Sequence, residues 1–296
     1  MNDLPQTEAR NPRTDSLDRL PSIELAGVLA SEQSEAVAAV VAACVPLAQA
    51  VDEITMRLAS GGKLHYVGAG SSGRIAFLDA SEMPPTFGTD PSLVCAHIAG
   101  GRDALTRAIE GAEDDGDAGE REMHGHVKTG DAVVGLSASG GAAFVVRALL
   151  AARETGAWTL GVTSNTGTEL GAAADLTIVL NTGPEPIAGS TRLKAGTAQK
   201  VLLNTLSTAT MVKLDKVYDN LMVDVVASNS KLRKRALRLV MQLVSTDEKA
   251  AANLLESAGG RVKVAVVMGC GALTAEEARA LLDSHGGSLR RALHRP

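Results

Sequence analysis

Hydrophobic residues along the chain fall into short apolar runs separated by segments of helical periodicity. Five runs are short and apolar enough to be buried strands, and they cover residues 63–68, 92–99, 131–137, 157–164 and 175–181. The segments between them can each supply a crossover helix: GRIAFLDASEM, RDALTRAIEGAED, GAAFVVRALLAARETG and TGTELGAAA. This alternation predicts an α/β fold, a three-layer αβα sandwich in which helices cover both faces of a parallel sheet.

The segments on either side of this pattern have a different character. Residues 1 to about 22 are polar and punctuated by proline, so we expect an arm without a core of its own. Apolar residues recur at helical spacing from 31 to 60, and Lys194 to Lys213 is typical of one long helix. No strand pattern follows Ser190, and the end of the chain carries short amphipathic segments such as 262–268. We therefore predict an arm and helix over 1–50, a sheet domain over 51–220 and a small helical C-terminal subdomain over 221–296.

Composition and charge exclude several classes of protein. Of 296 residues, 45% are hydrophobic and 21% are charged, which excludes wholesale disorder, collagen and coiled coil. The net charge of −5 has the wrong sign for a general polyanion binder, and only 2% of the residues are aromatic. The basic run at 231–238, KLRKRALR, is then a solvated helix face. We expect no nucleic-acid partner.

Cysteine usage and hydropathy indicate a reduced, soluble protein. Cys44, Cys95 and Cys270 are odd in number and lack CxxC spacing, so we interpret them as small core residues. The N-terminus is polar and is not expected to be a signal peptide. The most apolar stretch, 36–51, is shorter than the roughly 20 residues of a membrane helix. It predicts a buried helix, a cytoplasmic location and no membrane partner.

A glycine-rich turn follows the first predicted strand. Gly68-Ala69-Gly70-Ser71-Ser72-Gly73 satisfies G-x-G-x-x-G between a strand and a helix. A dinucleotide site would also need a carboxylate about 20 positions later, where the second strand instead ends in His97-Ile98-Ala99-Gly100-Gly101. The better interpretation is a cradle for a phosphate, in which the amides from Gly70 onward face the anion and Ser71 and Ser72 add hydroxyl donors.

A second turn of the same kind follows the third predicted strand. Ser137-Ala138-Ser139-Gly140-Gly141 opens another helix. Because ligands of open parallel sheets bind at the carboxyl ends of the strands, Ser137 and Ser139 join the candidate binding residues. The alternative is that both segments are merely tight turns and helix caps. Neither turn has a Walker-type lysine, so nucleoside triphosphate hydrolysis has no support.

Two acidic segments are candidates for acid and base chemistry. Glu82 lies in DASEMPP, where Pro84 and Pro85 are predicted to end the helix and to hold this carboxylate near the first turn. Glu113 lies in EGAEDD and can meet Glu82 over the sheet edge, which spacing alone does not establish. The neighbouring aspartates are expected to be a solvated helix end.

The histidines give no prediction of a metal site. His124 and His126 are two positions apart in a polar segment flanked by glycine, so we expect surface residues in a loop. His65 falls within the first strand and is expected to be a core histidine with satisfied hydrogen bonds.

Taken together, these stretches resemble N-acetylmuramic acid 6-phosphate etherases, which are built on the sugar isomerase (SIS) domain. The resemblance covers nearly the whole chain and includes TEARNPRTDSLDRL, HYVGAGSSGRIAFLDASEMPPTFG, IAGGRDALTRAIEGAEDD, GSTRLKAGTAQKVLLNTLST, NLMVDVVASNSKL and HGGSLRRAL. One departure lies after the second turn, where Gly141-Ala142-Ala143 stands for the family's usual Arg-Thr-Pro. Related regulators of sugar kinases share the first turn but are about twice as long.

The resemblance implies a reaction and roles for individual residues. It implies removal of the D-lactyl ether of a sugar phosphate by elimination and hydration, with Glu82 as the family's acid and Glu113 as its second essential carboxylate, the base. It also implies a homodimer, a small sugar-phosphate substrate, and neither a metal nor another cofactor. Ser71, Ser72, Ser137 and Ser139 then become candidates for gripping the substrate. The alternatives are a sugar-phosphate-binding regulator without chemistry and a sugar-phosphate isomerase on the same domain.

Overall fold

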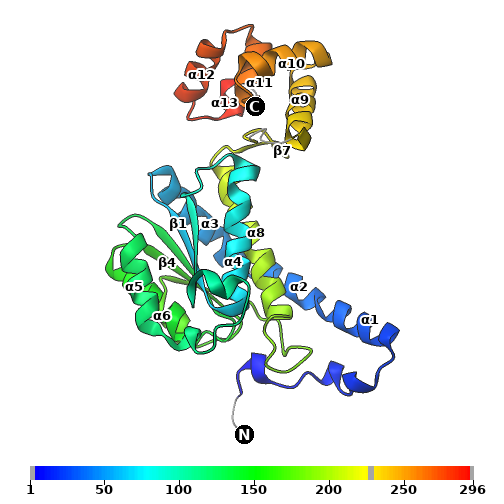
Figure 1. Ribbon diagram of the computed structural model, residues 1–296, viewed down its shortest axis with the longest axis vertical. Coiled ribbons are helices and arrows are strands. Elements are labelled where there is room, and N and C mark those ends of the chain that lie inside the picture. Colours follow the sequence, from blue (N-terminus) through cyan, green and yellow to red (C-terminus); the bar gives the residue numbers. More distant parts are fainter. Residues whose placement is uncertain (1–3, 226–229, 294–296) are drawn as a thin grey trace. The chain divides into compact units, whose positions relative to one another are not determined.

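A computed structural model describes residues 4–225 and 230–293 of the chain (Figure 1). The chain forms two compact units, of which the first comprises Met1–Ser81 and Ser92–Thr208 and the second comprises Glu82–Pro91 and Ala209–Pro296. Each unit has its own hydrophobic core.

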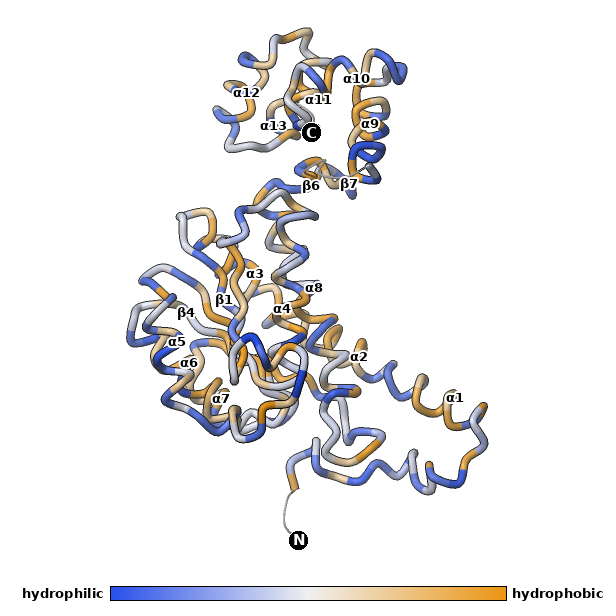
Figure 2. Tube along the Cα trace, in the orientation of Figure 1, coloured by the Kyte–Doolittle hydropathy of each residue, from blue (hydrophilic) through white to orange (hydrophobic). Residues whose placement is uncertain are grey.

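A five-stranded parallel sheet forms the centre of the first unit. Its strands are β1 (Leu64–Gly68), β2 (Val94–Ile98), β3 (Ala132–Leu136), β4 (Trp158–Thr163) and β5 (Leu176–Val179), in the order β2-β1-β3-β4-β5. Each predicted apolar run thus contains one strand, because a parallel sheet covered on both faces buries nearly every side chain of its strands. In Figure 2, the strands are mostly apolar.

Helices cover both faces of this sheet, which confirms the αβα sandwich. One face carries α5 (Gly116–His126), α6 (Ala143–Glu154) and α7 (Glu169–Ala173); the other carries α3 (Cys44–Ala59), α4 (Gly70–Phe87) and α8 (Lys194–Lys213) (Figure 1). Side chains alternate between the two faces along β1. Val67 packs in the cluster with α5 and α6, whereas Tyr66 donates a hydrogen bond to Asp79 of α4.

The N-terminal arm is an ordered part of the first unit. It contains three short 3-10 helices, η1 (Gln6–Glu8), η2 (Pro12–Thr14) and η3 (Leu17–Arg19), followed by α1 (Ser22–Glu32) and α2 (Ser34–Ala42). Asn11 and Thr14 donate hydrogen bonds to the carbonyls of Pro184 and Pro186. The arm therefore docks on the segment that precedes α8.

A buried ion cluster joins the arm to α1 and α8. The Glu32 carboxylate accepts hydrogen bonds from Arg13 at 2.6 Å and from the fully buried Lys194 ammonium at 3.1 Å. Hydrogen bonds from Arg13, Lys194 and Asn11 lower the pKa of Glu32 to about 2, against the opposing effect of burial. Glu185 accepts the first backbone N–H groups of α8, at Lys194 and Ala195.

The second unit is mainly helical. It contains a two-strand hairpin, β6 (Val217–Tyr218) and β7 (Leu221–Met222), and the helices α9 (Ser230–Val244), α10 (Glu248–Ser257), α11 (Val262–Gly271), α12 (Ala275–Ser284) and α13 (Leu289–Ala292). Helix α11 is the centre of the core and is buried from Val262 to Met268. Lys263 extends from it and donates hydrogen bonds to the Asp224 carboxylate and to two backbone carbonyls.

Several elements differ from the sequence predictions. The hairpin β6–β7 was not expected after Ser190, and 262–268 is a buried helix rather than an amphipathic one. The segment predicted as a helix after β2 instead forms two 3-10 turns, η4 (Gly101–Leu105) and η5 (Ala112–Asp114). Cys44 and Cys270 are exposed and Cys95 is half-buried, so the cysteines do not form part of the core.

One helical span has the length and apolar composition of a membrane helix. Within the described residues it is Ser22–Ala42, of which 22% of the tested window is buried. The span is divided at Gln33 between α1 and α2, and it contains Glu32, the centre of the buried ion cluster. The predicted buried helix over 36–51 is also only partly buried, because Val37, Val41 and Val45 are exposed.

Candidate active site

The turn between β1 and α4 brings backbone amides to the carboxyl edge of the sheet. Gly70 adopts a left-handed conformation with φ of +52°, and a Cβ on Gly68 would lie 2.7 Å from the nitrogen of Gly73. Glycine at these positions lets the strand pass closely into the helix. Ser72 is buried and Ser71 is half-buried at the start of α4, whose first N–H groups have no partner within the helix.

The turn between β3 and α6 presents two hydroxyl groups. The Ser137 hydroxyl accepts the Gly140 N–H at 3.1 Å, and the Ser139 hydroxyl accepts the Gly141 N–H at 3.3 Å. Ser137 is buried and Ser139 is exposed. The N-cap residue of α6, Ala142, gives the helix no side-chain cap, so an anion can take the place of a cap there.

The strand order places both turns at one point of the sheet. Gly68 at the end of β1 is paired with Leu136 at the end of β3, and the chain leaves these two strands toward opposite faces. In a sheet of order 2-1-3-4-5, this junction is where the connections diverge and leave a crevice for a ligand. Ser71 and Ser72 on one strand end and Ser137 and Ser139 on the next therefore flank the switch point.

Two residues that the sequence analysis did not single out brace the second turn. Asn165, which follows β4, is buried and donates hydrogen bonds to the carbonyls of Ala138 and Ser139 at 3.1 and 3.3 Å. Its amide nitrogen also lies 3.2 Å from the hydroxyl of Thr7, and the Thr7 carbonyl accepts the N–H of Gly189. The only sequence signal for Thr7 was its place in the TEARNP motif.

The two candidate glutamates are both exposed. Glu113 lies in η5 of the first unit, directly after Gly111 and Ala112, which line a pocket beside β2. Glu82 belongs to the second unit and to the C-terminal half of α4, 11 positions or about three helical turns beyond Ser71. The sequence had predicted that Glu82 is held beside the first glycine-rich turn. In the structure it lies away from that turn on its own helix.

The proline pair does not end α4. The helix continues through Pro84 and Pro85 to Phe87, and the N–H of Gly88 donates to the carbonyl of Pro84. Proline removes a donor but keeps its carbonyl, so the chain can remain helical beyond the pair.

A buried carboxylate three positions before Glu82 anchors α4 to the sheet and to α8. Asp79 accepts hydrogen bonds from Tyr66 at 3.0 Å, from Asn204 at 2.8 Å and from Ser207 at 3.2 Å. Burial raises the pKa of both Asp79 and Tyr66, although the three donors oppose the rise at Asp79. Asp79 thus serves to position α4 and was not identified from sequence.

The histidines also differ from expectation. His126 lies in the last turn of α5 rather than in a loop. His65 is buried as predicted, but its Nε2 has no hydrogen-bond partner among the described residues. Burial, and then the nearby His97, lower the pKa of His65 to about 4, so His65 is neutral.

The doubly wound sheet and its two hydroxyl-rich turns define a SIS domain protein. The SIS domain profile matches residues 113–209, and the profile of the glucokinase regulatory protein N-terminal SIS domain matches residues 46–153. A phosphoheptose isomerase from Francisella tularensis has the same fold, with a TM-score of 0.53 at 18% identity over 65% of this chain and 100% of that one.

Relatives of higher sequence identity show to which family of SIS domain proteins the chain belongs. An N-acetylmuramic acid 6-phosphate etherase from Symbiobacterium thermophilum is 51% identical over 88% of this chain and 87% of its own length. Another, from Deinococcus radiodurans, is 47% identical over 99% of this chain and 96% of its own length. The chain belongs to the N-acetylmuramic acid 6-phosphate etherase family.

Proposed function

We propose that this chain is a carbon–oxygen lyase that cleaves the D-lactyl ether of N-acetylmuramic acid 6-phosphate. The products are N-acetylglucosamine 6-phosphate and D-lactate, and the reaction serves cytoplasmic recycling of cell-wall amino sugars. The observation that carries the proposal is the match of relatives with this activity in their name over nearly the full length of the chain.

The binding site is proposed at the switch point between β1 and β3. Backbone amides from Gly70 onward and the hydroxyls of Ser71 and Ser72 hold the 6-phosphate at the start of α4, where the helix dipole favours an anion. Ser137 and Ser139, whose hydroxyls lie together in the second turn, bind the sugar. Local donors of this kind bind a phosphate although the chain has a net charge of −5.

Glu113 and Glu82 are proposed as the base and the acid. In the ring-opened sugar, the aldehyde acidifies the proton on carbon 2, which Glu113 removes. The bond between carbon 3 and the ether oxygen then breaks, and Glu82 protonates the departing lactate. Because Glu82 lies about three helical turns from Ser71 on α4, the Glu82 that acts here is supplied by the second copy of the chain. Water adds its oxygen to carbon 3 while a proton returns to carbon 2, so the sequence of steps is balanced without an oxidant or reductant. Acid and base steps each contribute roughly 10² to 10⁴ to the rate.

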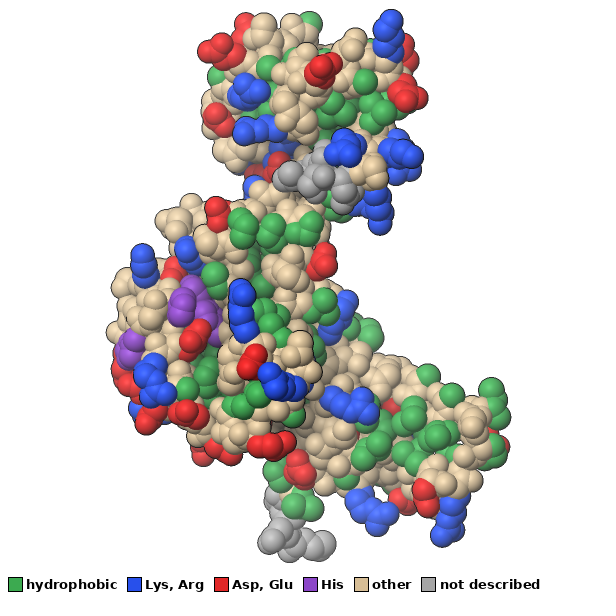
Figure 3. All heavy atoms as spheres, viewed as in Figure 1, with side chains coloured by type: hydrophobic (Ala, Val, Ile, Leu, Met, Phe, Trp, Pro, Cys, Tyr) green, Lys and Arg blue, Asp and Glu red, His purple; other side chains and the backbone are tan. Residues whose placement is uncertain are grey.

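A second copy of the chain is the proposed partner. Val37, Val41 and Val45 lie four positions apart, from α2 into the start of α3, and are 49%, 64% and 73% exposed. Figure 3 shows hydrophobic side chains gathered on the surface of α1 and α2. Such a stripe is normally covered by another surface. Sedimentation of the wild type should give a dimer, and Val41→Asp should shift it toward a monomer, whereas an unshifted variant would remove this stripe from the interface.

The function is tested by incubating the purified full chain with N-acetylmuramic acid 6-phosphate. We expect equal amounts of D-lactate, measured with a D-lactate dehydrogenase, and of N-acetylglucosamine 6-phosphate. A regulator that binds a sugar phosphate without chemistry would keep the two turns but would not need Glu82 and Glu113. Tight sugar-phosphate binding without lactate release would establish it in place of the lyase, and aldose–ketose interconversion would establish an isomerase.

A further inference from the structure

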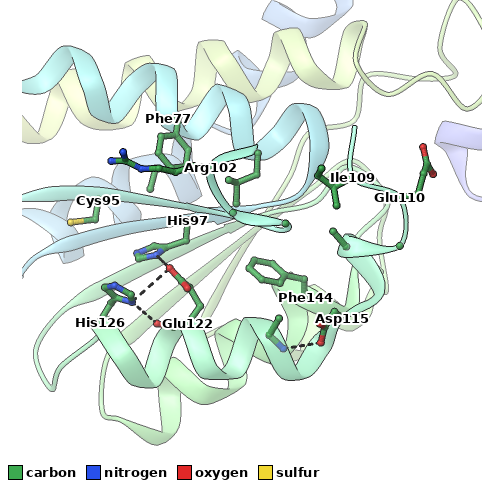
Figure 4. A pocket seen from close by; sticks show the side chains of 17 residues that line it. Phe77, Cys95, His97, Arg102, Ile109, Glu110, Asp115, Glu122, His126 and Phe144 are labelled. Atoms are coloured by element: carbon green, nitrogen blue, oxygen red, sulfur yellow. Dashed lines mark hydrogen bonds and ion pairs between the residues drawn. The ribbon is translucent and has the colours of Figure 1, made fainter. Parts of the chain in front are cut away.

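Three potential metal ligands converge beside the edge strand of the sheet. His97 lies on β2, and Glu122 and His126 lie four positions apart on the last turns of α5. One nitrogen of each imidazole and one carboxylate oxygen lie within 4.8 Å of one another. Figure 4 shows the three side chains directed toward one another at the wall of a pocket of about 780 Å³.

We propose that His97, Glu122 and His126 bind a divalent transition-metal ion such as Zn²⁺. Two imidazoles and one carboxylate, with further positions open to solvent, are a common ligand set for this class of ion. Glu122 and His126 are 40% and 55% exposed, whereas His97 is only 5% exposed. The ion would therefore enter from the pocket and lie against the buried ring of His97.

The geometry of the carboxylate favours a shared cation. Glu122 Oε1 lies 2.7 Å from His97 Nδ1 and 3.6 Å from His126 Nδ1. His126 Nδ1 is also 2.9 Å from the carbonyl oxygen of Glu122, which holds its ring over the same turn of α5. The rings of His97 and His126 have centroids 5.1 Å apart, so small rotations bring all three ligands to one point.

A second row of groups behind His97 supports the same conclusion. His97 Nε2 lies 3.1 Å from Nδ1 of His65, and His65 Nε2 lies 3.4 Å from the Asp131 carboxylate. Both oxygens of Asp131 already accept backbone N–H groups, from Lys63 and from Lys128. Metal-binding histidines are normally oriented by such partners on their second nitrogen.

Among the described residues, one buried atom of this row lacks a hydrogen bond that a cation would help to supply. Three contacts join Glu122, His97, His65 and Asp131 in this row. The buried Nε2 of His65 is the atom left without a hydrogen bond among the described residues. With a cation between Glu122 and His97 Nδ1, His97 Nε2 can donate a hydrogen bond to His65 Nδ1, and His65 Nε2 can donate one to Asp131. The buried Nε2 of His65 then has a hydrogen-bond partner.

The test is a titration of the full chain, stripped with EDTA, with ZnCl₂ in a calorimeter. We expect about one bound ion per chain, and His126→Ala should weaken its binding at least about tenfold. His126 is exposed, so its removal should leave the thermal melting of the metal-free chain unchanged. His124→Ala is the matched control, since His124 lies on the same helix but outside the cluster.

Several results would overturn the proposal: no Zn²⁺ binding by the wild type, the same affinity in His126→Ala, or an equal loss in His124→Ala. Because Cys44 and Cys270 are exposed, Co²⁺ is used as a second probe. We expect visible absorption without thiolate charge-transfer bands, and its loss in Glu122→Gln. Thiolate bands would instead assign the ion to the cysteines and refute the site. These readouts measure binding alone, so their failure leaves the proposed lyase activity unaffected.

Discussion

The Asn165 side chain lies 3.2 Å from the hydroxyl of Thr7, 158 positions earlier in the chain, and holds the β3–α6 turn through two carbonyls. Asn165→Ala should leave these buried groups without partners, which costs about 1 to 3 kcal/mol of stability. Because the turn carries Ser137 and Ser139, we also expect KM for the sugar phosphate to rise about tenfold, with a smaller change in kcat. Steady-state kinetics and urea unfolding measure the two effects.

The control for this prediction is Asn181→Ala. Asn181 accepts a hydrogen bond from Gln6 of the same arm, but the pair is exposed and does not touch the turn. An equal rise of KM in both variants would mean that docking of the arm matters in general and that Asn165 has no particular part in positioning the turn.

Replacing either proposed catalytic carboxylate should reduce turnover without reducing affinity. Glu82→Gln and Glu113→Gln are each expected to lower kcat by about 10² to 10⁴, because an amide neither accepts nor supplies the proton. Release of D-lactate gives kcat, and calorimetry with the sugar phosphate gives affinity. Glu154→Gln is the control, since Glu154 is exposed at the end of α6 farthest from the turns. Wild-type turnover in Glu82→Gln or Glu113→Gln would remove that residue from the reaction.

Two glycines of α5 should respond to alanine in opposite directions. A Cβ on Gly119 would lie 2.0 Å from the carbonyl oxygen of Phe144 on α6, whereas nothing lies within 4 Å of a Cβ on Gly125. Gly119→Ala must therefore separate the two helices, and overpacking of this kind costs about 1 to 3 kcal/mol. Gly125→Ala should be neutral or stabilising by up to about 1 kcal/mol, because alanine favours the helix. Urea midpoints that move in the same direction would contradict this packing.

Acid should loosen the N-terminal arm through Glu32. Its folded-state pKa, about 2, is below the ordinary value of 4.5, so the ionised carboxylate contributes stability that is present above about pH 4.5. This contribution is lost as the pH falls toward 2. We expect the melting temperature of the wild type to fall more steeply from pH 5 to pH 2.5 than that of Glu32→Gln. Glu35→Gln, which removes a more exposed partner of Arg13, should keep the wild-type slope; a flat wild-type profile would disprove the role of Glu32.

The sheet could be predicted from sequence because its strands are local apolar runs. The long helix α8 was predicted with its observed bounds, Lys194 to Lys213. The helix predicted after β2 was wrong, although the composition of that segment is helical. Gly100 and Gly101 adopt left-handed conformations there, and Ile109 packs over Gly100, so the chain folds back instead of forming a helix. That contact depends on tertiary structure, which a helical pattern does not contain.

Some residues of the candidate site could likewise be predicted from sequence, and others could not. The serines of the two turns could be found because each lies in a short segment that follows one strand. The contacts of Asn165 with Thr7, and of His97 with Glu122, join segments 158 and 25 positions apart, and neither has a local signature. The exposure of Glu82 was missed because the proline pair was expected to end a helix that in fact continues.

The docked arm has a consequence for synthesis of the chain on the ribosome. The partners of Thr7, Asn11 and Thr14 lie 158 to 182 positions later, at Asn165 and in the segment 184–189. At a synthesis rate of about 5 to 20 residues per second, roughly 10 to 40 seconds pass between synthesis of the arm and synthesis of these partners. The arm is thus made well before it can reach its native contacts, and during that interval Thr7, Asn11 and Thr14 lack the partners that they have in the folded chain.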